Sequence, residues 1–263
     1  MTDEVGLDVG RSALELADEA IDFGAELDTD ASRLEGGTTV IDLGVETDGT
    51  MDAGLLFAAL RRGGLIATEV RIDALGAHTW PYLEATTGHP ALARELAASR
   101  QVGTWSVSGP GLAGHQDPFA VVTAVGTEPV DEAGASEIAD ELGVSTDDLY
   151  VVTTAPGSIA WSVDAAMSTL ETAIDTISAT VSECALEVPL PPAVNAPDTA
   201  ADLADSCRAL GARVHLRLSS SLDEPLSSLD GDVPGTLTTV DDQGRVETIG
   251  ERDLVQLATQ FTE

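Results

Sequence analysis

Glu171 is the side chain of this 263-residue sequence best placed for acid–base chemistry, because it falls at the edge of a predicted amphipathic helix. The helix is indicated by apolar residues that recur three and four positions apart, namely Ile159, Val163, Met167, Leu170, Ile174 and Ile177. At about 100° per residue, a neighbouring face gathers Asp164, Ser168, Glu171 and Asp175. A carboxylate at the edge of an apolar stripe is partly desolvated, and proteins tune acid–base groups in such places. The same pattern is typical of a solvated acid on a polar surface, so both interpretations of Glu171 stay open.

A strand and a turn must position that helix. The stretch 149–154 reads Leu-Tyr-Val-Val-Thr-Thr, whose β-branched and aromatic content predicts a short buried strand. Ala155-Pro-Gly157 ends the strand, and Ser158 follows as a residue type that caps helix N-termini. We therefore expect a strand–turn–helix unit with Ser158 at the start of the helix.

Predicted strands and helices alternate along the chain, with hairpin-like strand pairs at 65–85 and near the C-terminus. This mixture favours an α/β fold of α+β character: a layered mixed sheet with helices, in two closely packed subdomains around a cleft. We take residues 1–263 as a single unit, in which the expected subdomains are 1–103 plus 231–263, and 104–230. The polar segment 219–234 is expected to be a flexible loop.

The composition is strongly acidic, with 46 acidic residues against 12 basic ones and a formal net charge of −34. All 12 basic residues are arginine. Such self-repulsion largely disappears in molar salt, where the Debye length is about 3 Å, so the charge indicates a cytoplasmic, halophilic protein. This surface disfavours nucleic acid and anionic membranes as partners, because neither attracts an acidic protein.

Other chemical motifs are weak. The sequence has no Gly-x-Gly-x-x-Gly between a strand and a helix, and without lysine it cannot have a Walker-type phosphate loop. Its four histidines are scattered, so we expect no metal site. Cys184 and Cys207 fit ordinary buried thiols. Ser108-Gly-Pro-Gly111 is either an ordinary turn or a turn that directs backbone N–H groups at an anion.

Several stretches, in order, resemble one enzyme family. Thr87-Gly-His-Pro-Ala91 is similar to Thr-Asp-His-Pro-Ala, and Ser108-Gly-Pro110 to the start of a Gly-Pro-Ala-Arg motif. Further similar stretches are Gly37–Val45, Ser158–Val163 and Leu170–Ala173. Together these motifs identify the chain as a diverged, shortened member of the methenyltetrahydromethanopterin cyclohydrolase family.

The resemblance implies a hydrolase that opens the cyclic N5,N10-methenyl bridge of a tetrahydropterin one-carbon carrier, of the methanopterin or folate type, to the N-formyl form. It implies Glu171 as the catalytic carboxylate, which would stabilise the cationic bridge and accept a proton from water. The substrate-binding residues that it implies are Ser108, Gly109, Pro110, Ser158, Ser168 and Thr87. It also implies no covalently bound cofactor, with the pterin carrier as substrate, and a homo-oligomer, a trimer in the family.

Three polar positions of the family pattern are changed in this chain. The family's arginine three residues before the catalytic glutamate is Ser168 here, and a second arginine is Leu112. The aspartate of Thr-Asp-His-Pro is Gly88. Two hypotheses therefore stay open: a working cyclohydrolase, or a catalytically impaired paralogue that acts as a pterin-binding, regulatory or structural subunit.

Overall fold

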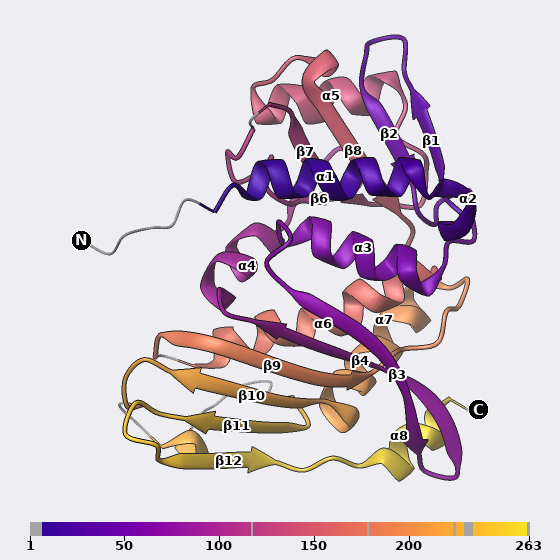
Figure 1. Ribbon diagram of the computed structural model, residues 1–263. Helices are drawn as coiled ribbons and strands as arrows, with labels where there is room; N and C mark the ends of the chain where they lie inside the picture. Colours follow the sequence, from indigo (N-terminus) through magenta and orange to yellow (C-terminus); the bar gives the residue numbers. More distant parts are fainter. Residues whose placement is uncertain (1–6, 117, 178, 223–224, 229–233, 262–263) are drawn as a thin grey trace. The chain divides into compact units, whose positions relative to one another are not determined.

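The protein folds into two compact units, as the computed structural model shows for residues 7–116, 118–177, 179–222, 225–228 and 234–261 (Figure 1). The first unit comprises the chain up to Leu65 together with Leu96–Ala155. The second comprises Ile66–Glu95 and the chain from Pro156 onward. The chain thus passes between the units after residues 65, 95 and 155.

The first unit is built on a six-stranded mixed sheet in the order β1-β2-β8-β7-β6-β5. Its strands are β1 (Asp30–Arg33), β2 (Thr39–Asp42), β5 (Arg100–Val102), β6 (Trp105–Ser108), β7 (Ala120–Val125) and β8 (Leu149–Thr154). The central pairs β2–β8 and β8–β7 are parallel, and the outer pairs are antiparallel. Nearly every residue of β7 and β8 is buried, as expected for parallel strands covered on both faces.

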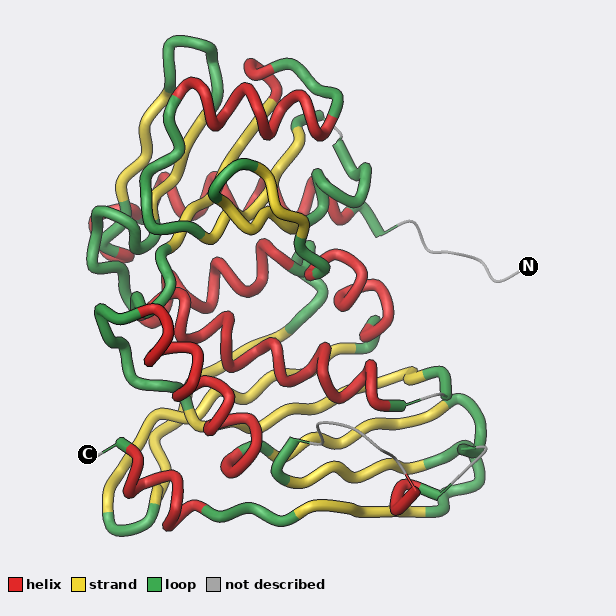
Figure 2. Tube along the Cα trace, turned by 180° about the vertical axis from the view of Figure 1, so that it is seen from behind, coloured by secondary structure: helices red, strands yellow, loops and turns green. Residues whose placement is uncertain are grey.

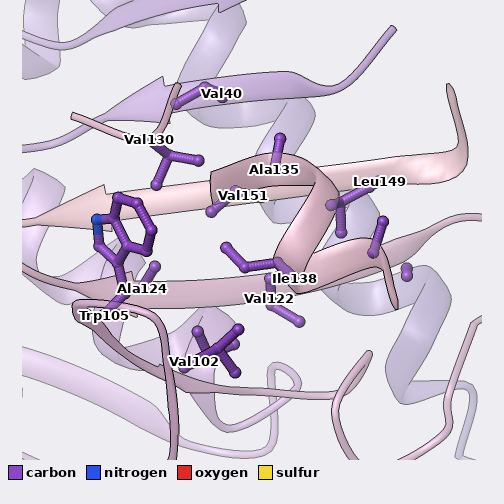
Figure 3. Close-up of a cluster of buried hydrophobic side chains, with 13 residues drawn as sticks. Val40, Val102, Trp105, Val122, Ala124, Val130, Ala135, Ile138, Leu149 and Val151 are labelled. Atoms are coloured by element: carbon purple, nitrogen blue, oxygen red, sulfur yellow. The ribbon is translucent and has the colours of Figure 1, made fainter. Parts of the chain in front are cut away.

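Helices cover both faces of this sheet (Figures 1 and 2). One face carries α1 (Val9–Asp22) and α3 (Met51–Arg61), which pack against each other and against β7. The other face carries α5 (Glu132–Leu142), which begins at the cap Asp131 and ends at the left-handed Gly143. Figure 3 shows the core beneath α5, where the Trp105 indole lies among small side chains of α5, β7 and β8.

The second unit has its own six-stranded mixed sheet, in the order β12-β11-β10-β9-β4-β3. Its strands are β3 (Ala67–Leu75), β4 (His78–Thr87), β9 (Val181–Pro189), β10 (Arg213–Leu218), β11 (Thr236–Val240) and β12 (Val246–Gly250). Only β10–β11 is parallel among these described pairs.

The helices of the second unit gather on one face of its sheet (Figure 2). The long helix α6 (Ile159–Thr176) packs on β9 and β4, beside α7 (Pro197–Ser206). Burial alternates along β10, so the opposite face is open to solvent, and His215 lies on that open face. The remaining short helices of the two units are α2 (Gly24–Leu27), α4 (Pro90–Ala97), α8 (Leu254–Gln260), and the single turns at 146–148, 207–211 and 226–228.

The predicted α/β class with mixed sheets is confirmed, and local details differ. The apolar spacing of residues 12–27 predicts one helix, whereas the structure has a break at Phe23 between α1 and α2. The sequence also predicts a helix from Pro90 to about residue 101, but the helix ends at Ala97, because residues 100–102 pair with β6 as β5. The residue type of Asp198 predicts a helix cap there, but α7 begins with Pro197 after Ala196. Residues 223–224 and 229–233 of the expected 219–234 loop lie outside the described residues.

The division into two units also differs from the one expected from the sequence. That expectation joined 231–263 to the N-terminal part of the chain. In the structure β11 pairs with β10 and β12 pairs with β11, so these strands extend the sheet of the second unit. No helix among the described residues combines the length and the apolar character needed to cross a bilayer.

Candidate active site

Helix α6 begins as the sequence predicts. The Ser158 hydroxyl accepts a hydrogen bond from the backbone N–H of Trp161 at 3.1 Å, which satisfies one of the free donors of the first turn. Gly157 precedes it with φ +90°, and its carbonyl accepts a 3.0 Å hydrogen bond from the N–H of Val194. Ser158 therefore has a structural role at the start of the helix that carries Glu171.

The predicted polar face of α6 becomes more exposed along its length. Asp164 is buried, with 2% of its surface exposed. Ser168 and Glu171 are half-buried, and Asp175 is exposed. The Ser168 hydroxyl donates to the carbonyl of Ala165 at 2.6 Å, so it bonds back to its own helix. Glu171 thus has the half-buried edge position that its spacing indicates.

Two residues of the sheet lie next to this edge of α6. The Cys184 thiol on β9 is close enough to Glu171 to feel its charge: burial, helped by that negative charge, raises the pKa of Cys184 to about 12. Cys184 pairs in register with Thr87 on β4. Thr87 is buried, and its hydroxyl accepts from the N–H of His89 at 3.0 Å. The fold therefore gathers Glu171, Cys184 and Thr87 in one region of the second unit.

An arginine lies one helical turn further along the same face. Arg94 of α4 forms an ion pair with Asp175, four residues after Glu171. Neither Cys184 nor Arg94 was predicted as a neighbour of Glu171, because strand pairing and the packing of α4 leave no local signal in the sequence. Among the described residues, no three His, Cys, Asp or Glu side chains gather in the way that metal ligands do.

The turn Ser108–Gly111 belongs to the first unit, and its polar groups are used internally. The Ser108 hydroxyl is buried against that of Thr123 at 2.9 Å. The N–H groups of Gly109 and Gly111 donate to backbone carbonyls at 2.9 Å, and Pro110 has no N–H. This geometry favours the interpretation as an ordinary turn over the anion-binding one. Leu112, at the position of the family's second arginine, packs against the hydrophobic core of this unit.

A hollow of about 450 Å³ lies on the open face of the second sheet, away from α6. Glu187 lies in its wall, held by Arg252 at 2.8 Å and Arg71 at 2.9 Å. His215 and Arg213 lie at the β10 end. Because this hollow lies on the face of the sheet opposite to Glu171, it takes no part in the carboxylate site.

Comparison with known proteins shows which family this chain belongs to. Residues 8–115 match the family model described as Cyclohydrolase (MCH). The chain is 36% identical over 248 residues to the methenyltetrahydromethanopterin cyclohydrolase of Halobacterium salinarum, which covers 82% of this chain and 77% of that protein. It is 29% identical over 180 residues to the protein of the same name from Methanocaldococcus jannaschii, and this alignment covers 60% of this chain and 55% of that protein. The chain is 27% identical over 191 residues to the protein of the same name from Methanosarcina barkeri, and this alignment covers 64% of this chain and 59% of that protein. The kinship inferred from the motifs is confirmed: this chain belongs to the methenyltetrahydromethanopterin cyclohydrolase family.

Proposed function

We propose that this protein hydrolyses the cyclic N5,N10-methenyl bridge of a tetrahydropterin one-carbon carrier to the N-formyl form. The observation that carries the proposal is the half-buried carboxylate of Glu171, to which the family resemblance assigns the catalytic role. The chain that carries it is 36% identical to the methenyltetrahydromethanopterin cyclohydrolase of Halobacterium salinarum. The pterin carrier is the substrate, and the proposal needs no covalently bound cofactor.

The chemistry requires one well-placed carboxylate. The methenyl bridge is an amidinium-like cation, so a neighbouring Glu171 carboxylate stabilises it electrostatically. A water oxygen bonds to the bridge carbon while Glu171 accepts one of its protons. One carbon–nitrogen bond then breaks to leave the N-formyl product, and overall one proton is released to solvent.

The changes at Ser168 and Leu112 are the reason to test activity directly. Leu112 packs against a hydrophobic core, and its side chain has no hydrogen-bond donor to offer a substrate. Ser168 bonds to its own helix. Neither change removes the carboxylate itself, and for that reason we favour an active hydrolase over a subunit that only binds pterin.

The test is an assay in molar KCl with methenyltetrahydromethanopterin and methenyltetrahydrofolate, in which loss of the methenyl chromophore is followed. We expect hydrolysis of at least one carrier, and the faster one identifies the carrier class. A protein that binds either carrier without consuming it would instead be a pterin-binding subunit, and the hydrolase proposal would be wrong.

The composition supports a cytoplasmic protein adapted to high salt, and the family resemblance alone supports an assembly of identical copies. A net charge of −34 without lysine predicts that the unfolding temperature rises steeply between dilute buffer and molar KCl. Light scattering in molar KCl measures the oligomeric state directly. A trimer mass would match the family expectation, and a monomer mass would contradict it.

A further inference from the structure

We propose that β3 pairs edge to edge with the β3 of a second copy of this chain, in antiparallel register about a two-fold axis at Val70. In this arrangement the six-stranded sheets of the two copies join into one continuous sheet. The inference concerns how copies of the chain assemble, so it does not depend on hydrolysis by Glu171.

The edge formed by β3 is the longest one in the described part of the chain. The two sheets end at β1, β5, β12 and β3; the first three have four, three and five residues, whereas β3 has nine (Figure 1). β3 keeps one unbroken register with β4 along its whole length and contains no proline. Native proteins often shorten an edge strand, or interrupt it with a bulge or a proline, to prevent pairing. β3 has none of these three features.

Every second residue of β3 presents its backbone polar groups to this open edge. Pro81 of β4 lies opposite Ile72, has no N–H, and its carbonyl accepts the N–H of Leu190 at 3.0 Å. The N–H and carbonyl of Ile72 therefore point away from β4. Because bonded and non-bonded pairs alternate in an antiparallel ladder, the backbone groups of Thr68 and Val70 point outward as well. A neighbouring strand can bond to all three residues.

The charges of β3 favour a second copy as that neighbour. Glu69 lies directly opposite Glu84 in the sheet, and like charges in this position destabilise a strand pair. Glu84 forms an ion pair with Arg71, whereas Glu69 has no ion pair among the described residues. With Val70 on the two-fold axis, Glu69 of each copy lies opposite Arg71 of the other copy. The pairing therefore supplies the missing cation twice.

The same register covers apolar side chains on the other side of the strand. Ile72 is 66% exposed, which is unusual for a large apolar side chain in this fold. In the pairing about Val70, Ile72 of each copy lies against Thr68 of the other copy, and the two Val70 side chains meet at the axis. Apolar contacts on one face thus accompany the ion pairs on the other.

Neighbouring registers fit less well. An axis at Arg71 places two arginines opposite each other, and like charges oppose such a pairing. An axis at Ile72 matches Arg71 with Asp73, but it extends the pairing to the hairpin tip, where Ala258 of α8 lies beside Gly76. The register about Val70 uses only residues 67–73 and leaves the tip to α8.

The competing explanation is that the charges of β3 protect the edge from pairing, as charged side chains on edge strands commonly do. Such protection requires charges that stay unmatched when two strands meet, whereas the register about Val70 matches them. The net charge of −34 opposes contact between copies in dilute buffer, and this repulsion largely disappears in molar KCl. The two explanations therefore differ most clearly in molar salt, where protection predicts no contact at β3.

Cysteine cross-linking in molar KCl tests the register. Val70→Cys places two thiols on the axis with their Cα atoms about 5.5 Å apart, which suits a disulfide. Ile72→Cys is the matched control, because it is more exposed but its two copies lie about 13 Å apart along the strands. The native Cys184 and Cys207 are buried. We expect copper phenanthroline to give a covalent dimer from Val70→Cys and not from Ile72→Cys. No dimer from Val70→Cys, or equal dimer from both variants, would overturn the inference.

Light scattering in molar KCl decides the same point without a new thiol. We expect an even number of copies: a dimer, or a hexamer if the trimer that the family resemblance implies also forms. Val70→Pro removes the central N–H donor of the open edge and should halve the mass. Val246→Pro, at the start of the opposite edge strand β12, should leave the mass unchanged.

Charge reversal is the third arm of the experiment. Glu69→Arg opposes two arginines on each side of the axis and should raise the dissociation constant about tenfold. A monomer or trimer mass for the unmodified protein would overturn the inference. An unchanged mass for Val70→Pro would overturn it as well.

Discussion

Gly157→Ala should be among the most damaging single-methyl changes in this protein, because Gly157 sets the start of the helix that carries Glu171. The residue has φ +90°, a conformation that L side chains rarely adopt. A Cβ atom there would lie 2.0 Å from the carbonyl oxygen of Val194, and real Cβ atoms essentially never approach another heavy atom within 3.0 Å. The backbone at 194 or the start of α6 must therefore move by about 1 Å.

Two contributions set the magnitude. The left-handed conformation costs about 1–2 kcal/mol for a residue with a side chain. Forcing an extra carbon into a filled space costs about 1–3 kcal/mol more. We therefore expect Gly157→Ala to lower the free energy of unfolding by about 2–5 kcal/mol. A shift of about 1 Å in a catalytic group can cost about 100-fold in rate, so kcat should also fall.

Gly244→Ala is the matched control, because Gly244 lies in the same unit, has φ +76°, and has no atom within 4 Å of its would-be Cβ. Gly244→Ala therefore has the conformational strain of a side chain at positive φ, but its Cβ atom meets no neighbouring atom. The two variants differ by the clash alone, about 1–3 kcal/mol, so thermal unfolding in molar KCl should place Gly157→Ala roughly 2–12 °C below Gly244→Ala, at about 2–4 °C per kcal/mol. Equal unfolding temperatures, together with equal kcat values, would refute the reasoning.

Three further changes test other parts of the structure. Ser158→Ala removes the hydroxyl that caps α6 and should cost about 1 kcal/mol, which Ser158→Thr largely recovers in thermal unfolding. Burial raises the pKa of Cys184 to about 12 and that of Cys207 further, so the folded state keeps protons that the unfolded chain releases above about pH 9. Stability should therefore be complete below pH 9 and fall as the pH rises beyond it, and denaturant midpoints that stay constant from pH 8 to pH 10.5 would contradict this. The Asp42 carboxylate accepts four backbone N–H groups from residues 44–47 at 2.7–3.0 Å, so Asp42→Asn should cost about 2 kcal/mol and increase hydrogen exchange in that loop.

Local features of the fold could be predicted from the sequence wherever the signal was strong. The cap at Ser158 and the helix after it were predicted because a capping residue precedes a regular apolar stripe. The residue types of 213–218 and 236–240 predict strands, and the structure has strands with these bounds. The helix that was expected to run to residue 101 was predicted too long, since tertiary pairing of β5 with β6 overrides helix propensity there.

The surroundings of Glu171 could not be predicted, because they depend on contacts between distant parts of the chain. Cys184 reaches Thr87 only through the pairing of β9 with β4, across 97 positions of sequence. Arg94 reaches Asp175 only through the packing of α4. Likewise, the turn at 108–111 admitted two interpretations until the acceptors of its N–H groups were known.

The most direct test of the central claim is the rate of methenyl hydrolysis by Glu171→Gln, compared with Glu183→Gln as a control. Glu183 is an exposed acid on β9, directly before Cys184 and on the opposite face of the strand. Both variants remove one negative charge, so only the position differs. We expect Glu171→Gln to lose at least about 100-fold in kcat, as for other general acid–base groups, while Glu183→Gln keeps the unmodified rate. Equal rates for the two variants would contradict the assignment of Glu171 as the catalytic carboxylate.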